Sequence, residues 1–400
     1  MRTVGEAEPR RRVAGSDPFA RDVEMEAALA QCERFLNGHG PRRARDLLAT
    51  IPDDTEVDYY GAGGVVADLE REVATLLGKP AAIFLPSGTM AQQIVLRIHA
   101  EARGRRSVAF HPACHLDSHE ERGYQLLHGL FAIPVGPRYE PLTVTALERV
   151  HEPVGALVVE LPQRDLGGVL PTWRELNAQV AWARERGAAT HLDGARLWES
   201  TSYYRRSPAQ IAALFDSVYV SFYKGLGGIT GCCVAGERDL IDEVGTWRTR
   251  HGGRLFGLWP YAASARTVLA TRLPLMGRYY RHARAIAAAL EDLRGVEVVP
   301  ASVQTSMMHL RLAVSVDELH SRALAIARTN RISTFPRVFV SDGARAQRVE
   351  FSVGDATLLF TPSEVRSLVE RLVRDAPVRR ARSASAAAPA ASKRPRGLGA

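Results

Sequence analysis

The sequence predicts an α/β protein with a large domain, built on a mostly parallel central sheet covered by helices, and a smaller C-terminal α+β domain. Short apolar runs typical of buried strands alternate with stretches of helical periodicity between about residues 64 and 235. After Arg238 the order changes to long helical stretches followed by several strands. A length of 400 residues also suits one large and one smaller domain better than a single core.

The large domain is expected to contain buried strands and helices in alternation. The strands are predicted at Ala81 to Leu85, Ser107 to Phe110, Phe131 to Val135, Gly155 to Glu160, Ala188 to Leu192, Ser217 to Phe222 and Gly231 to Ala235. The helices are predicted at Val66 to Leu77, from Ser87-Gly88-Thr89 through Ala102, Asp117 to His128, Val144 to Val150, Pro171 to Arg186 and Pro208 to Phe215. Gly78 and Gly187 are typical helix stops.

The remaining elements lie at the two ends of the chain. At the N-terminus we predict one helix, Met25 to Phe35, followed by a loop. The smaller domain is predicted to hold helices at Trp259 to Arg272, Leu275 to Leu293, Val316 to Thr329 and Pro362 to Arg374, and strands at Val296 to Val299, Met307 to Leu312, Ser333 to Val340 and Val349 to Val353. The resulting division is a disordered N-terminus (1–22), a helix and connecting arm (23–58), the large domain (59–257), the small domain (258–375) and a disordered basic tail rich in Ala, Ser and Pro (376–400).

The net charge of +8 is concentrated in that tail, which holds six basic residues and no acidic one, so the rest of the chain carries +2. This distribution favours a solvated appendage over a nucleic-acid-binding arm. No apolar run approaches the roughly 20 residues that span a bilayer, and the N-terminus lacks the apolar centre of a secretory signal. The four cysteines show no disulfide or Cys-x-x-Cys spacing, which indicates a reducing, cytoplasmic setting.

Lys224 is the first candidate for a catalytic residue. The chain has 52 basic residues but only three lysines, Lys79, Lys224 and Lys393. Lys224 follows a predicted buried strand and precedes a glycine-rich turn, and open α/β sheets bind ligands at such strand ends. Burial lowers the pKa of a lysine, and the free amine can then form a Schiff base with a carbonyl. The alternative is a solvated loop lysine.

Other strand ends carry polar residues of complementary kinds. Ser87-Gly88-Thr89 opens a helix, where backbone N–H groups favour a phosphate, although a plain N-cap has the same appearance. Asp193 could pair with a protonated ring nitrogen or simply cap a turn, and Arg196 could hold a carboxylate in a bidentate pair. His111, His115 and His119 have the spacing of a metal-binding helix, but Pro112 opposes one continuous helix, so we expect no metal. Together these are the groups that pyridoxal phosphate requires.

The sequence resembles the threonine aldolase / β-eliminating lyase family of fold-type-I pyridoxal-phosphate enzymes across roughly residues 55 to 370. The residues that carry the resemblance are Tyr60-Gly61, Leu69-Glu70, Leu77-Gly78-Lys79, Pro86 to Ala91, His115 with Glu120, His191 to Leu197, Lys224 to Gly227 and Gly252-Gly253. The run His191-Leu192-Asp193-Gly194-Ala195-Arg196-Leu197 is specific to this family, whereas the others are shared more widely.

The resemblance implies a role for each site residue. Lys224 would form the Schiff base, Asp193 would pair with the pyridine nitrogen, and His115 would stack on the ring. Ser87, Gly88 and Thr89 would hold the phosphate. Arg196 would bind the substrate carboxylate, with Arg348 as a second arginine.

The sequence also departs from the family pattern near the substrate. Where the family has Glu-Asn-Thr-His, with the histidine near the substrate's β-hydroxyl, this chain has Glu160-Leu161-Pro162-Gln163. Glutamine can hydrogen-bond a hydroxyl but cannot act as a base. The family's N-terminal Arg-Ser-Asp is replaced by Asn37-Gly38-His39, and Tyr223 stands where a serine usually precedes the lysine.

The expected activity is retro-aldol cleavage of L-threonine, L-allo-threonine or another β-hydroxy-α-amino acid to glycine and an aldehyde. Water, the cofactor phosphate or a histidine such as His39 or His128 would serve as the base. The close alternative is a related lyase, racemase or transferase acting on another amino acid, and a distant one is a non-catalytic binding protein that uses the basic tail. By resemblance we expect a homodimer or homotetramer in which Arg250 or Arg254 reaches a neighbour's phosphate, and no membrane or nucleic-acid partner.

Overall fold

The computed structural model describes residues 22–374, so the expectations for the basic tail and for residues 1–21 lie outside the described residues. The large domain is organised around a seven-stranded sheet in the order β2-β8-β7-β6-β5-β3-β4. β8 runs antiparallel to both of its neighbours, and the other pairs are parallel, which confirms the predicted mostly parallel sheet. The strands are β2 (Ala81–Leu85), β3 (Ser107–Phe110), β4 (Phe131–Pro134), β5 (Ala156–Glu160), β6 (Ala189–Gly194), β7 (Ser217–Ser221) and β8 (Cys232–Gly236).

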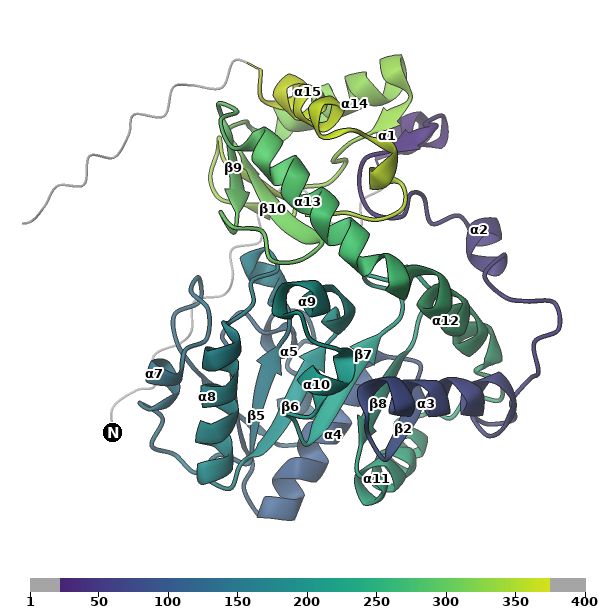
Figure 1. Cartoon of the computed structure of the whole chain (residues 1–400), viewed down its shortest axis with the longest axis vertical. Helices are drawn as coiled ribbons and strands as arrows, with labels where there is room; N and C mark the ends of the chain where they lie inside the picture. Colours follow the sequence, from purple (N-terminus) through teal and green to yellow (C-terminus); the bar gives the residue numbers. More distant parts are fainter. Residues whose placement is uncertain (1–21, 375–400) are drawn as a thin grey trace, which may run out of the picture.

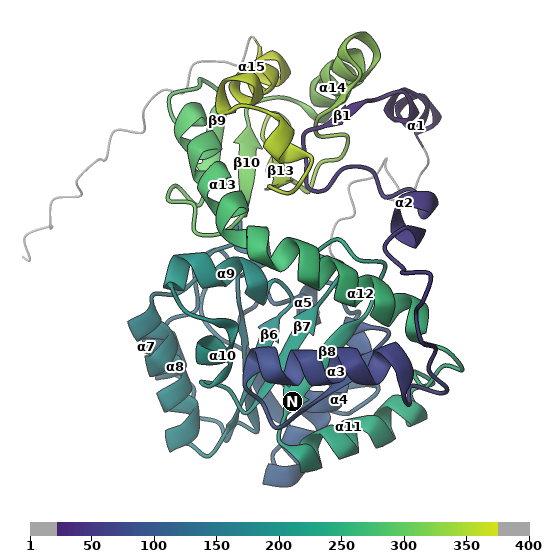
Figure 2. The same cartoon turned by 45° about the vertical axis from the view of Figure 1, so that its right-hand side comes forward.

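Helices cover both faces of this sheet (Figures 1 and 2). α4 and α11 pack together on one face, and their apolar side chains form a core with β2, β7 and β8. α3 packs on β2 and β8 in a second core that also takes in α8, α9 and α10. The helical elements are α3 (Gly64–Leu77), α4 (Gly88–Arg103), α5 (His115–Ser118), α6 (Gly123–Leu126), α7 (Val144–Leu147), η1 (Arg164–Leu166), α8 (Trp173–Glu185), α9 (Leu197–Tyr204), α10 (Pro208–Ala212) and α11 (Arg238–Arg250). Because both faces are covered, all six residues of β6 are buried.

The C-terminal part of the chain forms a four-stranded antiparallel sheet in the order β12-β13-β10-β9. Its strands are β9 (Val296–Val299), β10 (Met307–Leu312), β12 (Val340–Ser341) and β13 (Gln347–Ser352), and its helical elements are α12 (Trp259–Arg272), η2 (Leu273–Leu275), α13 (Met276–Leu290), α14 (Val316–Asn330), η3 (Thr357–Leu359) and α15 (Pro362–Val373). α12 packs on α3, and α13 continues from it onto the small sheet, so these two helices join the domains (Figure 2).

The N-terminal segment contributes to the small-domain side of the molecule (Figures 1 and 2). It contains α1 (Val23–Ala30), β1 (Arg34–Phe35) and α2 (Ala44–Leu48). β1 pairs in parallel with β11 (Ile332–Ser333), and the Asn37 side chain bonds the backbone of Glu350 and Ser352. The segment then returns along α2 to the large domain.

Three predicted elements were wrong. The helix from Met25 to Phe35 ends at Ala30, because Arg34 and Phe35 pair with β11. The helix from Asp117 to His128 is divided into α5 and α6, since Glu121 and Arg122 adopt left-handed backbone conformations. The strand from Ser333 to Val340 is reduced to its two ends, and Pro336, which has no N–H to donate, lies between them. The helices α2, α9 and α11 were not predicted.

Asp58 fixes the junction between the arm and the start of α12. Its buried carboxylate accepts hydrogen bonds from the backbone N–H groups of Gly61 at 2.7 Å, Leu258 at 2.8 Å and Trp259 at 2.7 Å. Replacing it leaves three donors without a partner, so Asp58→Ala is expected to lower the free energy of unfolding by about 3 kcal/mol. Urea denaturation measures the change. The exposed Asp53→Ala is the control, and an equal effect of both variants would contradict this assignment.

Candidate active site

The candidate site lies where neighbouring parallel strands of the large sheet end. Glu160 ends β5 and pairs in register with Asp193 of β6, which pairs in turn with Tyr219 of β7. Lys224 follows three residues after β7 ends at Ser221. The small domain closes this edge, because a side chain at Gly167 or Gly168 would collide with Val299 or Met307. The structure thus brings the predicted strand-end residues to one edge.

Lys224 carries an available amine. Its side chain is half-buried, and within residues 22–374 its Nζ has no hydrogen bond or ion pair, only the Tyr223 ring centroid at 5.9 Å. Burial lowers the pKa of this amine, an effect that the negative charge of Asp193 opposes. Lys79 differs, because its Nζ donates to the carbonyl of Phe215 at 2.5 Å.

Asp193 is almost fully buried, with 1% of its surface exposed. Its Oδ1 accepts the backbone N–H of Ala195 at 3.1 Å, and within the described part of the chain no hydrogen bond reaches Oδ2. Burial raises the pKa of this carboxyl, while the charge of Lys224 opposes the shift. A buried carboxylate group with one oxygen free of hydrogen bonds is suited to a protonated ring nitrogen.

Ser87, Gly88 and Thr89 lie at the start of α4. Ser87 is the N-cap, yet its hydroxyl makes no capping bond, and the first N–H groups of a helix have no intrahelical partner. Gly88 permits a close approach, since a Cβ there would lie 2.2 Å from the Tyr219 hydroxyl. A free hydroxyl and free N–H groups at a helix N-terminus are compatible with a bound phosphate.

His115 is held by Glu120. Its Nδ1 lies 2.9 Å from Glu120 Oε1, and the Glu120 carboxylate also accepts a hydrogen bond from Gln93 at 3.5 Å. Burial, supported by the charge of Lys224, lowers the pKa of His115 to about 4, and burial raises the pKa of Glu120 to about 7. A neutral ring fixed at one nitrogen is suited to stacking on a flat group. Among residues 22–374 no group of three or more His, Cys, Asp or Glu side chains is arranged to hold a metal ion.

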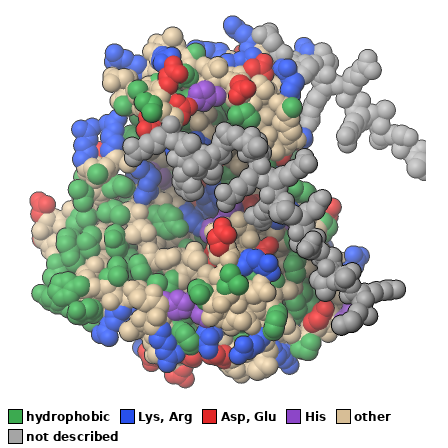
Figure 3. Space-filling view, turned by 180° about the vertical axis from the view of Figure 1, so that it is seen from behind, with side chains coloured by type: hydrophobic (Ala, Val, Ile, Leu, Met, Phe, Trp, Pro, Cys, Tyr) green, Lys and Arg blue, Asp and Glu red, His purple; other side chains and the backbone are tan. Residues whose placement is uncertain are grey.

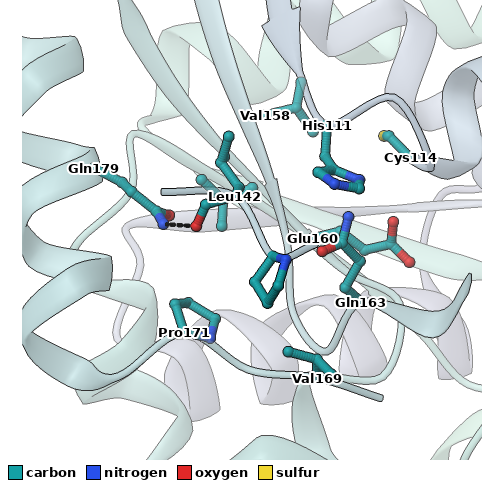
Figure 4. Close-up of a pocket in the computed structure, with 11 residues that line it drawn as sticks. His111, Cys114, Leu142, Val158, Glu160, Gln163, Val169, Pro171 and Gln179 are labelled. Atoms are coloured by element: carbon teal, nitrogen blue, oxygen red, sulfur yellow. Dashed lines mark hydrogen bonds between the residues drawn. The ribbon is translucent and has the colours of Figure 1, made fainter. Parts of the chain in front are cut away.

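Gln163 and Glu160 line a small cavity beside this edge of the sheet (Figure 4). The cavity is about 20 Å³, and Figure 4 shows the two side chains together near His111, with Gln179 on the opposite side. Glu160 Oε1 accepts the backbone N–H of Arg164 at 3.1 Å. Its Oε2 and the Nε2 of Gln163 are buried without a partner among the described residues.

Sequence reasoning noted Glu160 only as part of a motif. Burial, with the neighbouring charge of Asp193, raises the pKa of Glu160 to about 8. Its position at the end of a buried strand, which had already marked Asp193, was the signal that could have identified it.

The two predicted substrate arginines differ in their surroundings. Arg196 lies at the N-cap of α9, 3.4 Å from Glu350 and 3.8 Å from Glu199. Arg348 is held by Asp342, with N–O distances of 2.9 and 3.1 Å. Binding a substrate carboxylate at Arg348 would therefore require this pair to open. Sequence reasoning missed Arg164, whose Nε donates to Glu350 at 2.6 Å.

The two histidines suggested as bases lie in different places. His39 is next to the lysine loop, where its Nε2 donates to the carbonyl of Gly225 at 2.9 Å. His128 packs against His251 and Trp247, with ring centroids 5.0 and 5.9 Å away.

The fold is that of the pyridoxal-phosphate fold-type-I class of α/β enzymes, as the sequence predicted. The model of the β-eliminating lyase family matches residues 39–313, and the chain belongs to that family. Within it the chain is a threonine-aldolase-like lyase.

Three proteins that are similar to this chain are aldolases by name. A Listeria monocytogenes protein of known structure, assigned as an L-allo-threonine aldolase, is 38% identical, with a TM-score of 0.82 over 88% of this chain and 98% of that one. Aldolase vrtJ of Penicillium aethiopicum is 34% identical over 68% of this chain and 71% of its own length. Low-specificity L-threonine aldolase 1 of Arabidopsis thaliana is 27% identical over 67% of this chain and 78% of its own.

Glu160 makes the stability of the protein depend on pH. Its pKa is about 8 in the folded chain, above its ordinary value of 4.5, so between these values the folded state binds more protons than the unfolded state. The free energy of unfolding should therefore fall as pH rises from 5 to 8, by at most about 1.4 kcal/mol per pH unit from this group.

The variant Glu160→Gln removes this contribution. We expect its free energy of unfolding, from urea denaturation at several pH values, to depend less steeply on pH than that of the wild type. Exposed Glu152→Gln is the control. An unchanged slope in Glu160→Gln would show that Glu160 is already ionised.

Proposed function

We propose that this protein is a pyridoxal-phosphate-dependent aldolase that cleaves L-threonine, L-allo-threonine or a similar β-hydroxy-α-amino acid to glycine and an aldehyde. The observation that carries the proposal is the half-buried amine of Lys224, whose Nζ has no hydrogen bond or ion pair within residues 22–374 and experiences the charges of Asp193 and Arg196. The threonine aldolases among the relatives support the reaction class.

The residues present fit pyridoxal phosphate. Lys224 would hold its aldehyde carbon, Asp193 its ring nitrogen, His115 one face of its ring, and the segment Ser87-Gly88-Thr89 its phosphate. When bound, this cofactor supplies a protonated ring that takes up the electron pair released as a bond to Cα breaks. The burial of Asp193 supports its part, because a carboxylate shielded from water keeps a partner proton on the ring nitrogen more effectively.

The remaining residues would act on the substrate. Arg196 would bind its α-carboxylate, with Arg348 as a second candidate once its pair with Asp342 opens, and this binding fixes which bond to Cα is broken. Cleavage breaks the Cα–Cβ bond, the β-hydroxyl loses its proton as the aldehyde forms, and Cα gains a proton to give glycine. Gln163 would hydrogen-bond the β-hydroxyl but cannot take its proton. The base is then water, the cofactor phosphate or a histidine, and His39 is the histidine that lies beside the lysine loop.

We further propose that the protein works as a homodimer or homotetramer. Exposed Tyr59 and Tyr60 both contact exposed Phe256, and Arg254 donates to the Tyr60 carbonyl at 3.1 Å. Figure 3 shows hydrophobic side chains gathered along one flank of the large domain. Such a surface favours association, and Arg250 or Arg254 could then reach a neighbour's phosphate.

No helix among the described residues is long and apolar enough to cross a membrane. All four cysteines are buried and free. Free thiols support the proposal of a reducing compartment, the cytoplasm.

The test is an assay of the purified protein with pyridoxal phosphate, in which aldehyde and glycine are measured from L-threonine and L-allo-threonine. We expect release of both products by the wild type and a loss of at least about a thousandfold in Lys224→Ala. Lys79→Ala is the matched control and should retain activity. Absence of aldehyde from every β-hydroxy amino acid, with the cofactor bound, would contradict the aldolase and favour another amino-acid reaction.

A further inference from the structure

Three arginines lie on the small-domain side of the site, and each faces a carboxylate at a different distance. Arg348 is paired with Asp342 at 2.9 Å, and Arg164 with Glu350 at 2.6 Å. Arg196 has only longer contacts, 3.4 Å to Glu350 and 3.8 Å to Glu199. Of the three guanidinium groups, Arg196 is therefore the one with capacity for a further carboxylate.

Glu350 contacts both Arg164 and Arg196, but at different distances. Burial alone would raise its pKa, but the charges of Arg196 and Arg164 hold the pKa below its ordinary value, so the group is ionised. Its two oxygens face different arginines, and the short contact is with Arg164. Asp165, 4.0 Å from Arg164, adds further negative charge.

Arg164 acts electrostatically on the reacting groups. It directly follows Gln163, and its guanidinium rests over the Phe339 ring at 4.5 Å from the centroid. Its positive charge lowers the pKa of both Lys224 and His115, whereas the charge of Arg348 is not among the main influences on either. Without Glu350, Arg164 would keep only its 4.0 Å contact with Asp165, and its charge would be largely available next to Gln163, the residue proposed to bind the β-hydroxyl of the substrate.

We propose that Glu350 is a specificity-determining residue that neutralises Arg164 and so excludes amino acids with an anionic side chain. Arg196 then binds the single α-carboxylate, and the site selects substrates whose side chains are neutral. A second carboxylate would meet Glu350 and Asp165 rather than a free guanidinium, and like charges brought together weaken binding. This inference rests on the proposed function in one respect, namely that the amino-acid carboxylate binds at Arg196.

The test compares L-asparagine with L-aspartate, which have nearly the same shape but differ in side-chain charge. Calorimetric titration of the wild-type holoenzyme should give an affinity for L-asparagine at least about tenfold higher. Glu350→Gln should raise the affinity for L-aspartate about tenfold and change that for L-asparagine little. This gain in affinity for L-aspartate should disappear in the double variant Glu350→Gln/Arg164→Gln. The control variant Glu370→Gln, on the exposed face of α15, should bind both amino acids as the wild type does.

Equal affinity of the wild type for the two amino acids, with threonine cleavage intact, would overturn the inference alone. A folded Glu350→Gln protein that still prefers L-asparagine over L-aspartate as strongly as the wild type would also overturn it. Circular dichroism establishes folding, and if Glu350→Gln does not fold, the wild-type ratio decides the question. Failure of glycine and threonine themselves to bind would instead contradict the proposed function.

Discussion

The electrostatic interaction between a buried carboxylate and a half-buried amine is the constraint on which the rest of the site depends. Asp193 lies at the end of β6, and Lys224 follows the end of β7, so the parallel pairing of these strands brings them to one edge. The charge of each group lowers the cost of burying the charged form of the other, and so opposes the pKa shift that burial causes. Glu160, the next strand-end residue, shares this environment, and burial together with the charge of Asp193 raises its pKa to about 8.

The small domain supplies the charged residues that face the loop after β5. The loop after β5 carries Gln163 and Arg164 toward β13, where Glu350 and Arg348 project from the same face of the strand. Internal carboxylates pair with most of the positive charge at this boundary. The site is therefore not a general anion pocket, and its selectivity for one carboxylate follows from which arginine is left weakly paired.

The sequence allowed the central sheet, the strand-end residues and the family resemblance to be predicted, because each depends on a local pattern. Buried strands are continuous apolar runs, and the residues after them must lie at one edge of a parallel sheet. Pairings between distant segments could not be predicted in this way. β1 pairs with β11, nearly 300 residues later, and Arg164 pairs with Glu350, 186 residues later, and neither leaves a local signal. The break between α5 and α6 likewise lies at the left-handed residues Glu121 and Arg122, next to Glu120, whose side chain bonds His115.

The most direct test of the central claim uses the scarcity of lysine in this chain. The holoenzyme is treated with borohydride, which fixes a carbonyl cofactor to the amine that holds it, and its peptides are then analysed by mass spectrometry. We expect the pyridoxyl group on the peptide that contains Lys224 and an unmodified Lys79, whose amine donates to the Phe215 carbonyl. Modification at Lys79, or no cofactor on any lysine, would contradict it.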